Sequence, residues 1–481
     1  MLRILLEKEL RDIIYSTKFA ITFAAAAVLI LLSFYVGIRN YQESIHEYEN
    51  AKTTNAANIA AQTDWRQIQD RVFRRPQPLE ILVNGVTNDV GRTTDMRSSG
   101  ELNLINSRFS ADPLFAVFRF LDLNFVFVIV FSLFAILFGY DAINGEKESG
   151  TLKLVFSNRV SRASFILSKL LGSVLALGVP LLVPLLIGCL MLLGFGIPMS
   201  GLEWVRLGIV ILAGLLCFGV FLTLSIMVSA MVSRSSVSFL LSLVVWIFSV
   251  LIIPKGSVLL ASQIASVPSN DAVETQKRKF TADQRQKWMQ SFQQWFSAHM
   301  PSSPSAATSD SGFVNAMAAF QDSLQKANEE ARMDFYNRLD EDWRNKKDWQ
   351  EKWAFGISRI SLTAVFQIAA MSVAGTDVGM KYRYMQQLNR YRESFAETMR
   401  KKTGSSADYF RIVIKRFSGG QNDQEEKQKQ LNPSELPEFV EQPRSLGESM
   451  TASLFDMGLL VVLNAAFFGG AFFAFLKFDV R

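Results

Sequence analysis

The segment Asp141–Lys169 reads DAINGEKESGTLKLVFSNRVSRASFILSK and lies between two long apolar runs. It is charged, and glycines interrupt it at Gly145 and Gly150. An apolar run of roughly 20 residues is long enough to cross the hydrocarbon core of a bilayer. The segment is therefore predicted to be a loop between two membrane spans. A charged hairpin in such a place is typical of an element that another protein grips.

The composition argues against several classes of function. Of the 481 residues, 49% are hydrophobic, which is more than the usual share in a soluble domain. With only 2 His and 2 Cys, a His/Cys metal site is not expected. The net charge of +6 is modest and spread along the chain, without a Lys/Arg block that carries interleaved aromatic residues. Nucleic acid is therefore not expected as a partner.

Six apolar runs predict a mainly α-helical, polytopic membrane protein. The predicted spans are residues 19–38, 121–140, 165–197, 204–232, 237–262 and 451–476. The third span contains Gly178, Pro180 and Pro184, which predict a kinked or tilted helix. A seventh run, residues 360–375, is shorter and holds Gln367. It is predicted to be a buried or re-entrant helix.

Lys and Arg gather in the loops on one side of these spans, and this bias marks the cytoplasmic side of a membrane protein. They precede the first span, occur repeatedly in residues 141–164 and follow the last span, whereas the loop 198–203 has none. Both termini and the 141–164 segment are therefore expected in the cytoplasm. Residues 39–120 and 263–450 are expected to form two extracytoplasmic regions.

Residues 1–18 are predicted to form an amphipathic helix on the cytoplasmic membrane surface. Its apolar residues share one helical face: Leu2, Leu5, Leu6, Leu10, Ile13 and Ile14. The acidic residues Glu7, Glu9 and Asp12 argue against a cleaved signal peptide. The alternative is a solvated helical start with no role at the membrane.

The first extracytoplasmic region is expected to combine a helix with a small β element. Residues 41–75 are predicted to be a polar helix that the sequence Pro76-Gln77-Pro78 stops. Residues 79–90 alternate in polarity around Asn84-Gly85, which predicts a short strand pair.

The second extracytoplasmic region is expected to be mostly helical. Apolar residues at heptad-like spacing predict a helical hairpin over about 270–353. A third helix is expected over 378–402, and the charged, Gln-rich residues 419–443 are expected to form a mobile linker. The aromatic stripe that includes Trp288 and Trp295 is interpreted as packing, and the nearby His299 as a packing or surface residue.

The sequence lacks the motifs of common enzymes. No G-x-x-x-x-G-K-[ST], H-E-x-x-H or G-x-S-x-G motif occurs, so no catalytic residue is proposed. Ionisable groups are nearly absent from the predicted spans, and those near the span ends are expected to be solvated there: Asp122, Arg206, Lys255 and Asp456. This pattern argues against ion-driven transport. If the protein moves something, its energy must come from elsewhere.

The 141–164 segment itself predicts two short helical pieces. Gly150 is expected to end the first, and Thr151 to cap a short helix over 151–157. Ser161 is expected to cap the helix that enters the third span, with Arg162 in its first turn.

An apolar knob is predicted on the short helix. Leu152, Val155 and Phe156 share one face by their i, i+3, i+4 spacing. Exposed in the cytoplasm, they would need a groove on a partner protein. The alternative is an interfacial loop whose leucines dip into lipid.

The motif E-K-E-S-G-T-L, followed by S-x-x-V-S-R and a lysine, resembles the hallmark of the permease subunits of the second class of ABC exporters. The matching residues are Glu146, Glu148, Gly150, Thr151, Leu152, Ser157, Val160, Ser161, Arg162 and Lys169. Family members often have proline where this chain has Arg159. Further segments resemble a subgroup with enlarged outer domains: residues 76–85, 112–122, 359–376, 436–439 and 478–481.

The resemblance implies that the segment is a coupling helix, which fits a cleft on the ATP-hydrolysing subunit. The implied ATPase-coupling residues are Glu146, Glu148, Gly150, Thr151, Leu152, Val155, Phe156, Ser161 and Arg162. The resemblance also implies a six-span half that dimerises with a second copy or a related permease and pairs with two copies of an ABC ATPase. Residues 1–18 would be an elbow helix that bears on the same ATPase. No cofactor is expected to bind directly, since ATP and Mg belong to the ATPase.

The implied function is ATP-driven export across a bacterial inner membrane, and the lack of N-x-[ST] sequons fits that location. The alternative is mechanotransmission, in which the ATPase cycle drives an extracytoplasmic protein and no substrate crosses. A third class is a membrane-anchored sensor or scaffold without an ATPase. The substrate is not apparent from the sequence.

Overall fold

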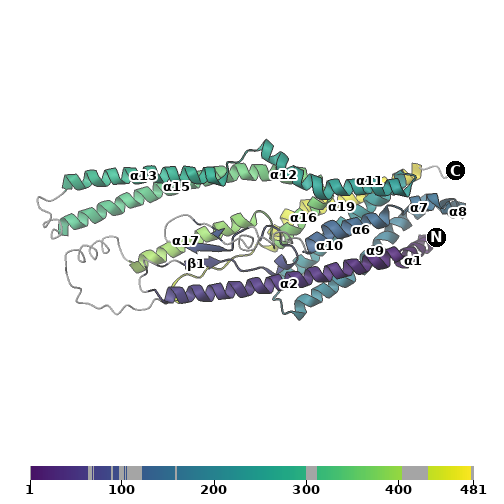
Figure 1. The fold of residues 1–481 in the computed structure, drawn as a ribbon, viewed down its shortest axis with the longest axis horizontal. Helices are drawn as coiled ribbons and strands as arrows, with labels where there is room; N and C mark the ends of the chain where they lie inside the picture. Colours follow the sequence, from purple (N-terminus) through teal and green to yellow (C-terminus); the bar gives the residue numbers. More distant parts are fainter. Residues whose placement is uncertain are drawn as a thin grey trace.

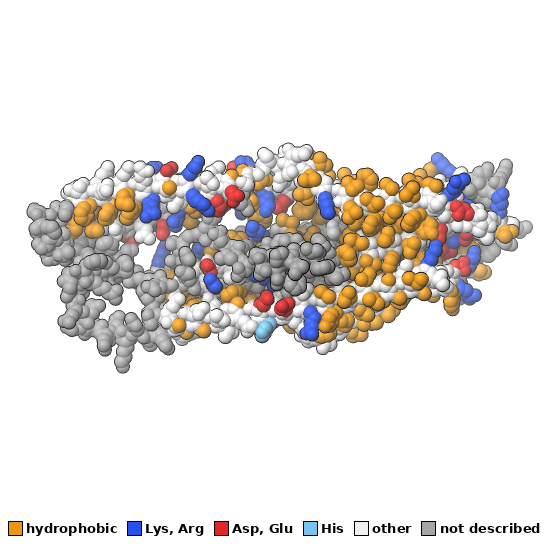
Figure 2. All heavy atoms as spheres, viewed as in Figure 1, with side chains coloured by type: hydrophobic (Ala, Val, Ile, Leu, Met, Phe, Trp, Pro, Cys, Tyr) orange, Lys and Arg blue, Asp and Glu red, His pale blue; other side chains and the backbone are white. Residues whose placement is uncertain are grey.

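The computed structural model describes residues 2–62, 70–87, 90–96, 122–157, 160–299, 311–403 and 432–477, with positions 65, 68, 102, 104 and 105. Within these ranges, six helices are long and apolar enough to cross a membrane, as the sequence predicts. The chain is an elongated, mainly helical molecule in which the six helices form a bundle at one end (Figure 1). Apolar side chains cover this bundle as a band between charged surfaces (Figure 2).

The candidate spans are built from single or segmented helices. Four of them are single continuous helices: α2 (Thr17–Ala60), α9 (Arg162–Gly194), α10 (Gly201–Met231) and α19 (Leu446–Lys477). The second span, Leu123–Glu148, comprises α5 (Leu123–Phe125), the π-helical η3 (Val126–Phe131), α6 (Ser132–Gly139) and α7 (Asn144–Glu148). The fifth comprises α11 (Ser235–Ile247), the π-helical η4 (Phe248–Ile252) and α12 (Ile253–Ile264).

The centre of the bundle is α10, which packs against α6, α9, α11 and α19. The short apolar helix α16 (Leu362–Ala374) lies against α10 and α19. Its residues Val365, Phe366 and Val373 have no exposed surface, so the prediction of a buried helix is confirmed. A helix this short cannot span a bilayer alone, and its burial follows from packing between two longer helices.

Polar contacts fix the start of α16. The Oγ atom of Ser249 in η4 accepts a hydrogen bond from the backbone N–H of Leu362 (2.9 Å). Arg359 binds both carboxylate oxygens of Asp456 in α19, at 2.5 and 3.0 Å. Asp456 has 0% exposure, and Arg206 in α10 only 7%. The expectation that these two residues are solvated at span ends is therefore wrong, because neighbouring helices cover them. It is also wrong for Asp122, which is buried and accepts the backbone N–H groups of Phe125 and Asn84.

The part of the molecule outside the helical bundle, which we call the polar half, contains a small sheet. Its strands β1 (Asp70–Phe73), β2 (Thr93–Met96) and β3 (Leu104–Ile105) form an antiparallel sheet in the order β1-β2-β3. Two expectations are wrong here. The first polar helix does not reach residue 75, because α2 ends at Ala60 and β1 follows. The predicted strand pair at 79–90 is replaced by the 3-10 helix η2 (Pro78–Ile81) and a turn.

The turn explains why Asn84-Gly85 makes no hairpin. Gly85 has a φ of +50°, and a Cβ there would lie 2.2 Å from the carbonyl oxygen of Thr376. The N–H of Val86 donates to that same oxygen (3.1 Å). The backbone therefore hydrogen-bonds to the end of α16 and is not available to a partner strand.

Long helices complete the polar half. The predicted helical hairpin is present as α13 (Asn270–His299) and α15 (Ser311–Ser358), and the third helix as α17 (Met380–Thr403). Rings stack between the hairpin helices, with centroids 4.1 Å apart for Phe280 and Phe335 and 5.0 Å for Trp295 and Phe320. This confirms that the aromatic stripe is packing. Most of the predicted linker, residues 419–431, lies outside the described residues.

Helices α2 and α9 pack so closely at Gly188 that a larger side chain there should be destabilising. A Cβ at Gly188 would lie 2.4 Å from ring carbons of the fully buried Phe34, whereas a Cβ at Gly178 in the same helix meets nothing within 4 Å. We expect Gly188→Val to destabilise the bundle by about 1–3 kcal/mol, since overpacking forces neighbours apart. Thermal unfolding in detergent measures this loss, and Gly178→Val is the matched control. Equal midpoints for the two variants would contradict the close packing.

Candidate functional site

The 141–164 segment lies at one end of the bundle, with α1 (Leu2–Ile14) beside it (Figure 1). Gly150 has a φ of +73° and separates α7 from α8 (Thr151–Ser157), which has the predicted bounds. The carbonyl of Gly150 accepts the N–H of Lys153 (3.3 Å), so Thr151 lies in the first turn rather than at the cap. Ser161 caps α9 as predicted, since its Oγ accepts the N–H of Ser164 (3.1 Å). Arg159 lies outside the described residues.

A buried ionic cluster joins three parts of the chain at this end. Lys169 in α9 places Nζ 2.7 Å from a carboxylate oxygen of Glu9 in α1 and 2.8 Å from one of Glu146 in α7. Lys169 and Glu9 are both buried. The cluster therefore fastens the first helix and the 141–164 segment to the start of α9.

The electrostatics of Glu9 reflect this burial. Desolvation raises the pKa of its carboxyl above the ordinary value, and Lys169 opposes that rise. Close packing accompanies the ion pair, because a Cβ on Gly172 in α9 would lie 2.7 Å from the side chain of Glu9. Burying a carboxylate is tolerated here because a cation lies in direct contact.

Further contacts tie the segment to the remaining spans. Glu148 accepts hydrogen bonds from the N–H (2.8 Å) and hydroxyl (2.9 Å) of Ser235 at the start of α11. Arg162 donates to the carbonyl of Leu476 near the end of α19 (2.7 Å). Two backbone N–H groups at the start of α7 donate to Ser229 in α10 (3.1 Å each).

The first span is joined in the same way. Asp141 lies 2.6 Å from Nζ of Lys18, near the start of α2. Together these bonds connect the 141–164 segment to α2, α9, α10, α11 and α19. At this end of the bundle, the segment is thus bonded to all five of the remaining candidate spans.

The prediction that the apolar face of the short helix is exposed is wrong. Leu152 is only 3% exposed, and the ring of Phe156 lies 5.6 Å from that of Phe165 and 6.1 Å from that of Phe475. The helix α8 lies against the ends of α9 and α19, so this face is covered by the chain itself. The exposed apolar residue is Leu154, at 67%. The outward face of α8 consists of Thr151, Lys153, Leu154 and Ser157.

The structure shows which contacts the implied coupling residues make within the chain. Among the implied coupling residues, Glu146, Glu148, Ser161 and Arg162 hold the chain together, while Gly150 shapes the turn. Sequence reasoning missed Glu9 as a member of this site. A usable signal was present: Glu9 follows Leu5 by four residues and precedes Ile13 by four, so it lies on the apolar face of the helix.

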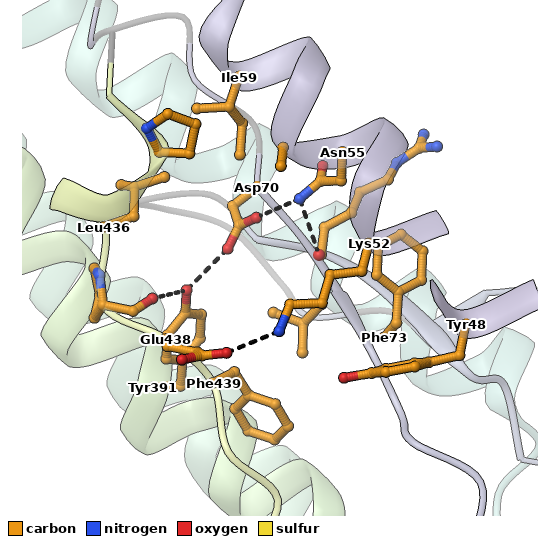
Figure 3. Close-up of a pocket in the computed structure, with 15 residues that line it drawn as sticks. Tyr48, Lys52, Asn55, Ile59, Asp70, Phe73, Tyr391, Leu436, Glu438 and Phe439 are labelled. Carbon is orange, nitrogen blue, oxygen red and sulfur yellow. Dashed lines mark hydrogen bonds and ion pairs between the residues drawn. The ribbon is translucent and has the colours of Figure 1, made fainter. Parts of the chain in front are cut away.

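A second candidate site is a pocket of about 400 Å³ in the polar half (Figure 3). The hydroxyl of Tyr391 from α17 lies 2.8 Å from Asp70 of β1 and 2.7 Å from the carbonyl of Pro437. Asn55 of α2 also donates to Asp70 (2.8 Å). Burial and Asp70 raise the pKa of Tyr391 above its ordinary value. These groups are engaged in holding residues 436–439 against α2, β1 and α17.

The described part of the chain contains no candidate metal site. Within the described ranges, no cluster of three or more His, Cys, Asp or Glu side chains has a suitable arrangement. Cys217 is buried and Cys189 is half-buried, and both lie inside candidate spans.

Comparison with known families identifies the group of proteins to which the chain is related. The sequence model described as ABC-2 family transporter protein matches residues 3–480. The chain belongs to the ABC-2 transporter family. It is therefore an ABC-2 type permease. Permeases of this family are membrane components that are not themselves nucleotide-binding enzymes and that generally partner with an ABC ATPase. No curated protein matches the chain.

Proposed function

We propose that this ABC-2 permease couples ATP hydrolysis by a separate ATPase subunit to export across a bacterial inner membrane. The observation that carries the proposal is the bonding of the 141–164 segment to the ends of all five other spans. These bonds lie in the residues on either side of α8, and α8 itself packs through Leu152 and Phe156, so a displacement of α8 would also displace the spans. Its outward face, with Leu154 and Lys153, is the surface that the ATPase would contact.

In this proposal each contact passes the motion to one helix. Glu148 would carry it to α11 and Arg162 to α19, while the Lys169 cluster would carry it to α9 and α1. ATP and Mg²⁺ would remain on the ATPase. Two such subunits would engage two permeases, the second being another copy of this chain or a related one.

The π-helical segments η3 and η4 are positions at which the second and fifth spans could bend. They lie in the second and fifth spans, and Trp246 Nε1, just before η4, donates to Ser132 Oγ, just after η3 (2.7 Å). A π-helical turn within an α-helix frequently marks a functional position. Rearrangement at this bond would change how the two spans pack.

A substitution on the outward face of α8 tests whether this face contacts the ATPase. Leu154→Glu should leave membrane insertion intact but reduce co-purification of the ABC ATPase at least about tenfold, because a charge replaces an exposed apolar contact at an interface centre. Pull-down from co-expressing membranes, with ATP hydrolysis as the second readout, measures this. Val440→Glu is the matched control, since Val440 is 72% exposed in the polar half. Unchanged co-purification and hydrolysis in Leu154→Glu would remove the proposal's main support.

The side of the membrane is tested separately. Both native cysteines lie inside candidate spans, so Lys153→Cys introduces one exposed thiol on α8. A membrane-impermeant maleimide should label it only after the inner membrane is opened. Labelling of intact cells with a permeable outer membrane would place α8 outside and overturn the proposed coupling.

Mechanotransmission is the second candidate function, and the hairpin α13–α15 is the observation that favours it. This hairpin extends far from the bundle (Figure 1). In that case an extracytoplasmic protein should raise ATP hydrolysis by the reconstituted complex without substrate flux. Replacing residues 280–345 with a short linker should then abolish the stimulation.

A further inference from the structure

A cavity of about 550 Å³ lies at the end of the bundle opposite the 141–164 segment. It is bounded by the loop between α9 and α10, the starts of α10 and α19, and the residues before η2. Its volume is in the range of pockets that hold small ligands. Five acidic or basic residues line it: Arg75, Glu203, Arg206, Glu441 and Arg444.

Arg206 lines this cavity as a buried arginine whose hydrogen bonds are incomplete. Its side chain is only 7% exposed, and its Nε atom has no hydrogen-bond partner. Its Nη2 donates to the backbone carbonyl of Arg444. Among the described residues, no carboxylate lies within ion-pair distance of this guanidinium. A buried cation without a counter-charge is costly, so such a group is normally found with an anion.

The other charges of the cavity form no direct ion pair with Arg206, although the Glu203 carboxylate attracts it over a longer distance. The carboxylate of Glu203 accepts the N–H (2.6 Å) and hydroxyl (2.9 Å) of Ser200, which caps α10. Arg444 is already paired with Asp377 (3.3 Å). Burial raises the pKa of Glu441 to about 7, so that this side chain is partly protonated near neutral pH and carries less negative charge.

Arg75 adds a second available cation at the rim. It lines the same cavity and is exposed. Two guanidinium groups, one buried and one at the entrance, suit an oxyanion, because the planar fork of arginine binds phosphate oxygens in pairs.

We propose that this cavity binds a phosphate group, with Arg206 as its buried anchor and Arg75 at its entrance. The location favours phosphate, because the cavity lies where the candidate spans end and lipid headgroups are expected. The apolar Leu202 and Leu446 also line it, and Leu202 is largely exposed. The phosphate can come from an anionic lipid headgroup or from a soluble organic phosphate.

The test uses the full chain in detergent, with three probes that share or lack the chemistry. Dihexanoyl phosphatidylglycerol and glycerol 3-phosphate carry a net negative phosphate, whereas dihexanoyl phosphatidylcholine is neutral overall. We expect the thermal midpoint to rise saturably with at least one anionic probe. Saturation by phosphatidylglycerol alone identifies a lipid headgroup, and saturation by both identifies a soluble organic phosphate as sufficient.

Variants then assign the binding to Arg206. Arg206→Gln should raise the half-saturating concentration at least about tenfold, and Arg206→Lys should lie between it and the wild type, because lysine keeps the charge but lacks the fork. Arg39→Gln is the matched control, since Arg39 lies in α2 outside this cavity. If Arg206→Gln does not fold, Arg75→Gln at the rim should still weaken binding at least about threefold. An unchanged titration in the folded variants, or equal binding of phosphatidylcholine, overturns the proposal.

Discussion

Lys169→Met is expected to lower the stability of the protein by about 3–5 kcal/mol, the typical loss when one partner is removed from a buried ionic cluster. The variant leaves Glu9 and Glu146 facing each other near the start of α9 without their shared cation. We expect α1 to detach from α9 and the thermal midpoint in detergent to fall. Co-purification of the ABC ATPase should fall with it, because α1 and α7 lose their common anchor.

The pH dependence of this variant has a definite sign. Without Lys169, the pKa of Glu9 should rise further, because only burial and neighbouring carboxylates then act on it. A carboxyl whose folded pKa is raised keeps its stability below its unfolded pKa and loses it as pH rises through the folded pKa. The deficit relative to wild type should therefore be small at acidic pH and grow towards pH 8.

Two further variants check this interpretation. Lys153→Met makes the same substitution on the exposed face of α8 and should leave the midpoint unchanged. The combination Glu9→Gln, Glu146→Gln and Lys169→Met removes all three charges and should recover most of the loss, because uncharged groups of similar shape tolerate burial. If the triple variant is as unstable as Lys169→Met, packing rather than charge holds this end together.

Arg359→Met is the second substitution with a large expected effect, again about 3–5 kcal/mol. It removes the two bonds to Asp456, whose carboxylate has 0% exposure in α19. The buried carboxylate is then left without a cation, and the start of α16 loses its anchor. We expect a lower thermal midpoint and faster proteolysis near residue 360.

The control for this prediction is an exposed ion pair. Arg338→Met in α15 breaks the i,i+4 contact with Asp334 (3.7 Å), which is solvated and should contribute about 0.5 kcal/mol or less. A rescue variant, Arg359→Met with Asp456→Asn, should recover part of the stability, since the amide needs no counter-charge. Equal effects of Arg359→Met and Arg338→Met would show that the pair at Asp456 is not buried as described.

Several local features were predictable from sequence because their signals are local. Span length in apolar residues gave the six candidate spans, and Ser161 and Gly150 marked a helix start and a turn. The heptad-like spacing gave the α13–α15 hairpin. The errors arose where a pattern has two solutions. Residues around Asn84-Gly85 can turn a hairpin or bind another backbone, and the contact with Thr376 decides between them.

The orientation of α8 shows the same limit. The spacing of Leu152, Val155 and Phe156 predicts one apolar face, and that prediction holds. Spacing gives no information on whether a partner or the chain itself covers the face. In the structure Phe165 and Phe475, from spans far apart in sequence, lie against it.

The sequence alone determined that this chain is a helical membrane protein with a charged loop between its second and third spans, because hydropathy and charge act over short stretches of chain. Only the tertiary structure decided that Glu9, Lys169 and Glu146 form one cluster, and that Arg359 pairs with Asp456. It also decided that Arg206 is buried beside a cavity. Burial and ion pairing depend on which helices meet, and residues brought together from distant parts of the chain carry no mark of it in their local sequence.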